Sequence, residues 1–113
     1  MAGTALRVAD DLAQDGVSVE VVDLRTLLPL GLPTVLDPVS KTRRAVIAQG
    51  SVGFAGAGGE IAAQINEHRF GQLDAPIARV AAAFTPVPHA APLIGAHQPG
   101  RRDLKAAVRR VVG

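Results

Sequence analysis

The chain has 113 residues, 48% of them hydrophobic and 19% charged, which suits one folded domain and excludes two. Twelve basic and ten acidic residues give a net charge of +2, and only 3% of residues are aromatic, which argues against a nucleic-acid surface. The sequence has no cysteine, and no apolar run approaches the roughly 18 residues of a membrane span, so we expect a cytoplasmic protein that does not contact membranes.

Apolar spacing predicts a helix at the start of the chain. The residues of one face, at helical intervals within residues 4–14, are Ala5, Leu6, Ala9, Leu12 and Ala13. We expect Thr4 to be the N-cap and Gly16 to stop the helix. Asp10 and Asp11 are predicted on its outer face.

Strands and helices then alternate. Residues 17–24 are β-branched and almost continuously apolar, which predicts a strand covered on both faces. Residues 32–39 have helical spacing, and we expect Pro33 to start this helix and Pro38 to kink or shorten it. Residues 45–49 predict a second buried strand.

The second half of the chain continues the same alternation. Ile61 and Ile65 share one face of a helix, and residues 77–83 predict a third strand. A final helix is expected to run from Asp103, as its N-cap, to Gly113. This order predicts parallel strands with right-handed crossovers, and hence an α/β fold: a three-layer α/β/α sandwich with a mainly parallel sheet.

Local motifs do not indicate a reaction. The glycine-rich residues 50–59 match neither the dinucleotide fingerprint nor the P-loop, so we expect these glycines to allow close packing against a neighbouring domain. A small-ligand module that binds phosphate compounds remains an alternative. His89 is the one candidate acid or base, against a plain hydrogen-bonded loop histidine. We assign no catalytic, cofactor-binding or metal-binding residue.

Three stretches, taken together in order and spacing, are more specific. DLRTLLPL (Asp23–Leu30), GGEIAAQI (Gly58–Ile65) and LDAPIARV (Leu73–Val80), the last followed by TPVP, resemble the C-terminal, transketolase-like domain of 2-oxo acid dehydrogenase beta subunits. Pyruvate, branched-chain and acetoin dehydrogenases are the members that the chain is most similar to. The resemblance implies that residues 1–113 form a single, N-terminally incomplete domain that lacks the first two strands of a five-stranded sheet.

The resemblance also implies a role. It predicts a domain for subunit assembly and for docking the acyltransferase core, with an alpha subunit and a pyrimidine-binding domain as further partners in a homo- or hetero-oligomer. Thiamine diphosphate and Mg would belong to the parent complex and not to this domain alone, so no activity is expected from the isolated chain. The alternative is a non-enzymatic, truncated remnant that self-associates through an exposed strand edge.

Candidate interface residues follow from the resemblance and from the glycine-rich and proline-rich loops. Gln49 and His89 stand where the family usually has Glu and Tyr, respectively, and Ala82-Ala83-Phe84 replaces a Gly-x-Asp turn. The full set of interface candidates is Gln49, Gly50, Phe54, Gly56, Gly58, Glu60, Pro86, Pro88 and His89.

Overall fold

Helices and strands alternate along the described part of the chain. The computed structural model describes residues 1–24, 32–53, 56–83, 90, 92 and 98–112. The elements, in chain order, are α1 (Ala2–Gln14), α2 (Leu32–Thr42), β1 (Val46–Val52), α3 (Ala57–Arg69), the short 3-10 helix η1 (Phe70–Gln72), β2 (Ala78–Ala82) and α5 (Arg101–Val112).

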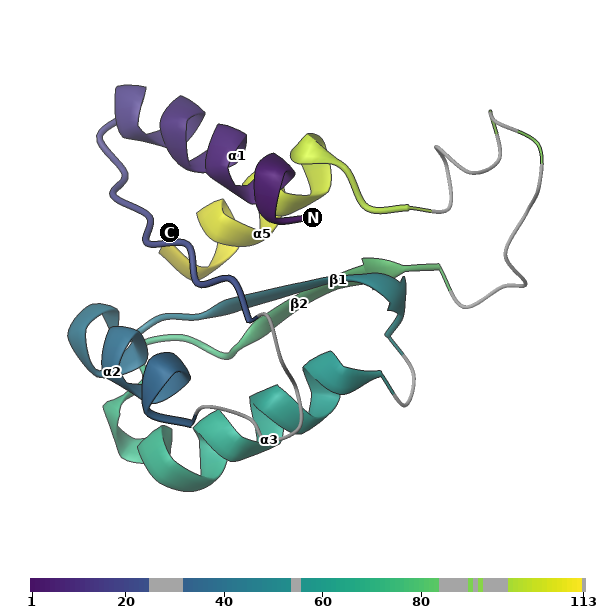
Figure 1. Cartoon of the computed structure of the whole chain (residues 1–113). Coiled ribbons are helices and arrows are strands. Elements are labelled where there is room, and N and C mark those ends of the chain that lie inside the picture. The colour runs from purple at the N-terminus through teal and green to yellow at the C-terminus, as the bar shows by residue number, and fades with distance from the viewer. Residues whose placement is uncertain (25–31, 54–55, 84–89, 91, 93–97, 113) are drawn as a thin grey trace.

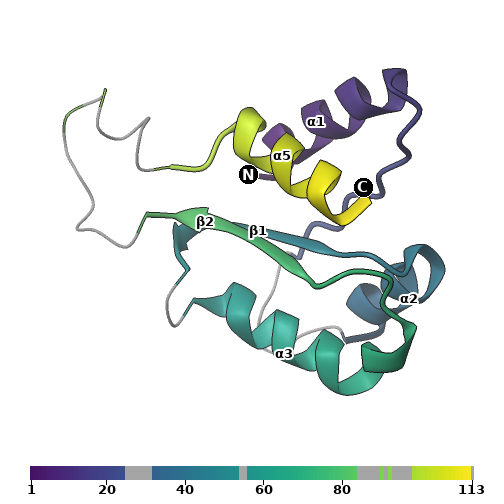
Figure 2. The same cartoon turned by 180° about the vertical axis from the view of Figure 1, so that it is seen from behind.

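The elements stack in three layers. Helices α1 and α5 cover one face of the strands, and α2 and α3 cover the other, as Figures 1 and 2 show from opposite sides. Each interface has its own apolar core: Val8 and Leu12 of α1 pack against β2 and α5, while α2 and α3 bury Ile61 and Ile65 with their neighbours. The predicted α/β fold is therefore confirmed.

The two strands β1 and β2 are parallel neighbours. Their register aligns Val46 with Ala78 and Ala48 with Val80, and α3 makes the crossover between them. Side chains alternate between the layers as a pleated strand requires, so Val46 packs toward α1 and α5 whereas Ile47 packs toward α2 and α3. The strands predicted over residues 45–49 and 77–83 are confirmed.

The strand predicted over residues 17–24 is wrong, because this segment belongs to neither strand of the described sheet. It nevertheless runs between the two helix layers (Figure 1). Val19 packs against the core under α1 and α5, Leu24 packs against the opposite core, and Glu20 pairs with Lys41 of α2 at 2.6 Å. A strand is defined by its backbone bonds to a neighbour, so an apolar, alternating segment without a paired neighbour in the sheet does not become one.

The N-terminal end of α1 differs from the prediction, whereas its C-terminal end agrees with it. The helix begins at Ala2 with Met1 as N-cap, so Thr4 lies within the first turn and is not the cap. Gly16 stops the helix as predicted: its φ of 82° is left-handed, which glycine adopts without a steric penalty. Val17 donates its backbone N–H to the Leu12 carbonyl at 2.9 Å, which completes a Schellman ending.

Pro38 does not end α2, which continues to Thr42. The proline removes one backbone donor, but burial of Val35, Leu36 and Val39 on one face stabilises the helix beyond it. The Thr42 hydroxyl donates to the Pro38 carbonyl at 3.0 Å and strengthens this last turn.

The N-cap predicted for α5 is also wrong. The helix begins at Arg101, two residues before Asp103. The Asp103 carboxylate instead reaches back to accept the Gly100 N–H at 2.8 Å, as the third residue of a capping box does. None of the helices in this described part of the chain is both long and apolar enough to cross a membrane.

Candidate functional site

The structure brings five of the predicted interface residues to one corner of the domain. Gln49 and Gly50 lie in β1, Gly56 is the N-cap of α3, and Gly58 and Glu60 lie in its first turn. The other four candidates, Phe54, Pro86, Pro88 and His89, lie outside the described residues. The corner is thus the junction between a strand end and the helix that follows it.

Gln49 and Gly58 hold this junction together. The Gln49 side-chain oxygen Oε1 accepts the Gly58 backbone N–H at 2.7 Å. Gly58 is buried, and a Cβ added there would collide with Gln49 Oε1 and lie 3.1 Å from Cγ2 of Ile47. The close approach at Gly58 is to β1 of the same chain, and the expected packing of the glycine-rich segment against a neighbouring domain stays a prediction.

The hydrogen bond between Gln49 and Gly58 also argues against the alternative that the glycine-rich segment binds phosphate compounds. A helix N-terminus binds an anion through backbone N–H groups that have no other acceptor. At α3 the Gly58 N–H is already bonded to Gln49, and the Gly59 N–H bonds to the Gly56 carbonyl at 3.1 Å. The first turn therefore offers a phosphate fewer donors than a P-loop does.

Two side chains present polar groups around this corner. Glu60 is exposed and accepts a hydrogen bond from Gln64 Nε2 at 2.9 Å. Arg79 of β2 is exposed as well, and its Nη1 lies 3.5 Å from the Gly53 carbonyl oxygen. The corner thus combines one carboxylate, one guanidinium and exposed glycine backbone at Gly50, which is a surface able to contact another protein.

Reactive groups do not converge within the described residues. His68 lies in the last turn of α3, where its Nδ1 is 2.8 Å from the Gln64 carbonyl oxygen, and His89 lies outside the described part. No three His, Cys, Asp or Glu side chains of the described residues come close enough together to hold a metal ion.

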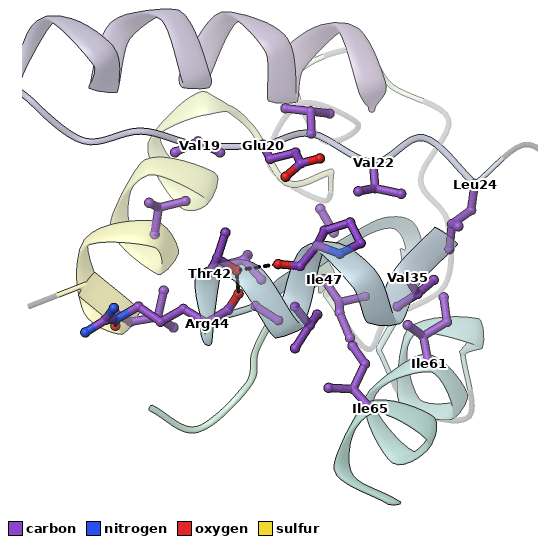
Figure 3. A pocket seen from close by; sticks show the side chains of 18 of the residues that line it. Val19, Glu20, Val22, Leu24, Val35, Thr42, Arg44, Ile47, Ile61 and Ile65 are labelled. Carbon is purple, nitrogen blue, oxygen red and sulfur yellow. Dashed lines mark hydrogen bonds between the residues drawn. The ribbon is translucent and has the colours of Figure 1, made fainter. Parts of the chain in front are cut away.

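A cavity of about 620 Å³ lies beside β1, and its lining includes Gln49 and Gly58 of the corner described above. It lies between residues 17–24 and β1, and Figure 3 shows Val19, Val22 and Leu24 along one side and Ile47 on the other. The family resemblance implied a missing strand between residues 17–24 and residues 45–49, and the cavity lies at that place.

Charged residues at the edge of this cavity have partners within the chain. Arg44 donates from Nε to the Val111 carbonyl at 2.8 Å, and its Nη1 lies 3.7 Å from a carboxylate oxygen of Asp74. Glu20 pairs with Lys41. The cavity wall between these pairs is mostly aliphatic.

Two helix layers enclose a parallel strand pair, and a glycine-rich junction joins β1 to α3, so the described residues form a layered α/β domain. The chain belongs to the family "Transketolase, C-terminal domain", which matches residues 1–112. This match confirms the family resemblance seen in the three sequence stretches.

The relatives point to one kind of subunit. The chain is 38% identical over 112 residues to the pyruvate dehydrogenase E1 component subunit beta of Bacillus subtilis, covering 99% of this chain and 34% of that protein. It is 40% identical over 110 residues to subunit beta-2, mitochondrial, of rice, covering 97% and 29%. The Leifsonia xyli subunit beta is 47% identical over 90 residues, covering 80% and 27%. The chain thus spans about a third or less of each of these relatives.

Proposed function

We propose that this chain is the C-terminal assembly and interaction domain of a pyruvate dehydrogenase-type beta subunit. In this role it supports subunit association and docking of the acyltransferase core during oxidative decarboxylation of 2-oxo acids. The observation that carries the proposal is the family match over residues 1–112, together with relatives that are named as beta subunits of pyruvate dehydrogenase. Its partners are an alpha subunit, a pyrimidine-binding domain and the acyltransferase core.

The corner formed by β1 and α3 is the proposed contact surface. Gly50 and Glu60 are exposed there, and the Gln49–Gly58 hydrogen bond fixes the helix start against the strand end. A fixed backbone supports the proposal because a preorganised surface loses less conformational freedom when it binds a partner.

Thiamine diphosphate and Mg are proposed for the parent complex only. The described residues do not fit the metal, because no three of their His, Cys, Asp or Glu side chains come together to coordinate it. We therefore derive no step of the reaction through the cofactor on this chain. Its contribution is proposed to be structural, through contacts with other subunits.

Co-purification tests this role. The tagged chain is mixed with an alpha subunit and a pyrimidine-domain polypeptide of the Bacillus subtilis type, and we expect all three to elute together. Glu60→Arg reverses a charge on the proposed surface and should weaken binding, whereas Asp10→Arg makes the same change on the exposed side of α1 and should not. Melting curves of both variants check folding. Failure of the unmodified chain to bind, or equal loss in both variants, would contradict the proposal.

Activity measurements provide a second test. The purified chain, supplied with pyruvate, thiamine diphosphate and Mg²⁺, is expected to release no carbon dioxide above background. Measurable turnover by the chain alone would show that it carries its own catalytic site and would overturn a purely structural role.

A further inference from the structure

The edge of β2 that faces away from β1 is unpaired in the described sheet. Ala78 donates its backbone N–H to the Ala45 carbonyl at 3.2 Å, so residues 78 and 80 direct their backbone groups toward β1. Alternation along the strand directs the N–H and C=O groups of Arg79 and Ala81 toward the outer edge. The sheet of the described residues holds only β1 and β2, so no strand bonds to these groups there. Such an edge is a template for pairing with another chain.

A cavity of about 290 Å³ lies beside the start of this edge. Its walls come from residues 75–79, which lead into β2, and from Arg110 and Val111 in the last turn of α5. No residue of β1 is part of this lining, which places the cavity away from the β1 side. Figure 2 shows β2 running between α5 above and α3 below, so a segment along the edge would meet both helix layers.

The charge around this cavity is positive. Arg110 is exposed, and no carboxylate of the described residues lies within ion-pair distance of it. Asp74, directly before the cavity lining, is already held by Arg43 at 3.0 Å and by Arg44 at 3.7 Å. Asp103 lies two turns earlier on α5, where its carboxylate caps the start of the helix. Three arginines therefore stand against one carboxylate at this end of β2.

Charge decides between two kinds of occupant. Two copies of the chain paired through β2 about a two-fold axis would bring two sets of these arginines to one interface, and like charges placed opposite each other destabilise strand pairing. An acidic segment would instead place a carboxylate against Arg110, and guanidinium groups bind carboxylates through two parallel hydrogen bonds. The edge therefore favours an acidic partner over a second copy.

We propose that the outer edge of β2 binds an acidic, extended segment of a partner protein by strand addition. Backbone hydrogen bonds to Arg79 and Ala81 would supply affinity, and Asp or Glu at alternate positions, on the side of α5, would pair with Arg110. Apolar residues at the other positions would face the side of Ile77. The inference concerns this edge alone and does not depend on the proposed assembly role.

A short peptide tests the proposal on the native chain. The probe is acetyl-Val-Glu-Val-Glu-Val-Glu-amide, and the same peptide with Lys in place of Glu is the control. We expect the Glu peptide to bind, more weakly as NaCl is added, and to slow amide hydrogen exchange at Arg79 and Ala81 by about tenfold or more. Val80, which faces β1, should change much less. No binding at about 1 mM peptide, or equal binding of the Lys peptide, would overturn the proposal.

Two N-methylated forms of the Glu peptide separate strand addition from simple charge attraction. N-methylation removes a backbone donor, and only every second amide of an added strand faces β2. Methylation of one alternate set of amides should therefore abolish binding, whereas methylation of the other set should leave it within about threefold. Equal effects of the two forms would mean that the peptide does not bind as a strand and would overturn the proposal.

Charge reversal on α5 tests the role of the arginine. Arg110→Glu should weaken binding of the Glu peptide by about tenfold or more. Arg102→Glu is the matched control, because Arg102 is exposed on the same helix but does not line the cavity, and it should change binding by less than about threefold. Melting curves of both variants check folding. Equal loss in the two variants would contradict a contact at Arg110.

The unbound chain distinguishes the remaining occupants. As a monomer, verified by light scattering, it should exchange Arg79 and Ala81 faster than Val80. Protection of Arg79 and Ala81 that appears only in a dimer would assign the edge to a second copy. Equal protection of all three amides in a monomer would mean that the chain itself already covers the edge. Either result would overturn the proposed occupant.

Discussion

The side-chain oxygen of Gln49 accepts the backbone N–H of Gly58 at 2.7 Å and so ties the end of β1 to the first turn of α3. The two residues are nine positions apart and lie on either side of the glycine-rich segment. Their contact orients α3 against the sheet, and the exposed corner that we propose as the interface depends on it.

Replacing Gly58 by alanine should destabilise the domain. The added Cβ would meet Gln49 Oε1 and Ile47 Cγ2, and overpacking of this kind costs about 1–3 kcal/mol. Gly3→Ala is the matched control, because a Cβ at Gly3 of α1 has nothing within 4 Å, and alanine there favours the helix by up to about 1 kcal/mol. Urea unfolding of both variants measures the difference. Equal effects would contradict the packing at Gly58.

Substitution of Gln49 tests the hydrogen bond itself. Gln49→Leu removes the acceptor of the Gly58 N–H and should lower the free energy of unfolding by about 1–3 kcal/mol. Gln49→Glu keeps an acceptor and adds a negative charge near the start of α3, which should stabilise by about 0.3–1 kcal/mol. Urea unfolding at pH 7 measures both. A Leu variant as stable as the native chain would contradict the contact.

Asp11 should give the domain a pH-dependent contribution to stability. Arg101 donates a hydrogen bond to the Asp11 carboxylate at 2.5 Å, and this bond lowers the pKa of Asp11 below 3.8. Desolvation acts in the opposite direction but is outweighed, and Lys105, whose Nζ lies 3.5 Å from the carboxylate, lowers the pKa further. A pKa lowered by folding stabilises the folded state above the unfolded pKa, and this contribution is lost as the pH falls through the folded pKa.

Asp11→Asn should therefore be less stable than the native chain at about pH 5 to 7, which lies above the ordinary pKa of a carboxyl group. The difference should shrink as the pH falls below 3.8. Urea midpoints across the acid range measure this, and Asp10→Asn, at the exposed neighbouring position, should have little effect at neutral pH. A constant difference down to strongly acid pH would rule out the Asp11 ion pair as its source.

Leu12 should be among the most important apolar side chains of the domain. It is fully buried between α1, β2 and α5, so Leu12→Ala should cost about 2–5 kcal/mol. Leu6 lies on the same helix but is 56% exposed, and Leu6→Ala should change stability by less than about 0.5 kcal/mol. Thermal unfolding of the two variants provides the comparison. Similar losses in both would mean that α1 does not pack on the face described.

Periodicity and turn residues were enough to predict most of the elements. The strands near residues 45–49 and 77–83 and the end of α1 at Gly16 were foreseen, because each depends on neighbours close in sequence. The order of elements and the three family stretches were likewise sufficient for the α/β class and for the family.

Other features depended on contacts that local sequence does not specify. Asp11 was predicted on the outer face of its helix, but its local sequence does not reveal that α5 brings Arg101 against it from 90 positions away. Residues 17–24 have the composition of a strand, but composition determines only which faces of a segment are apolar. A segment becomes a strand only where the fold places a neighbouring strand beside it for backbone hydrogen bonds, and residues 17–24 belong to neither strand of the described sheet.

The sequence by itself thus determined the class, the family and the spacing of helices and strands, because these follow from side-chain periodicity and short-range backbone preferences. Only the tertiary structure decided that Gly58 packs on Gln49 and that a cavity separates residues 17–24 from β1. Both depend on where segments distant in sequence come to lie, and that position is fixed by the packing of two apolar cores on either side of the strands.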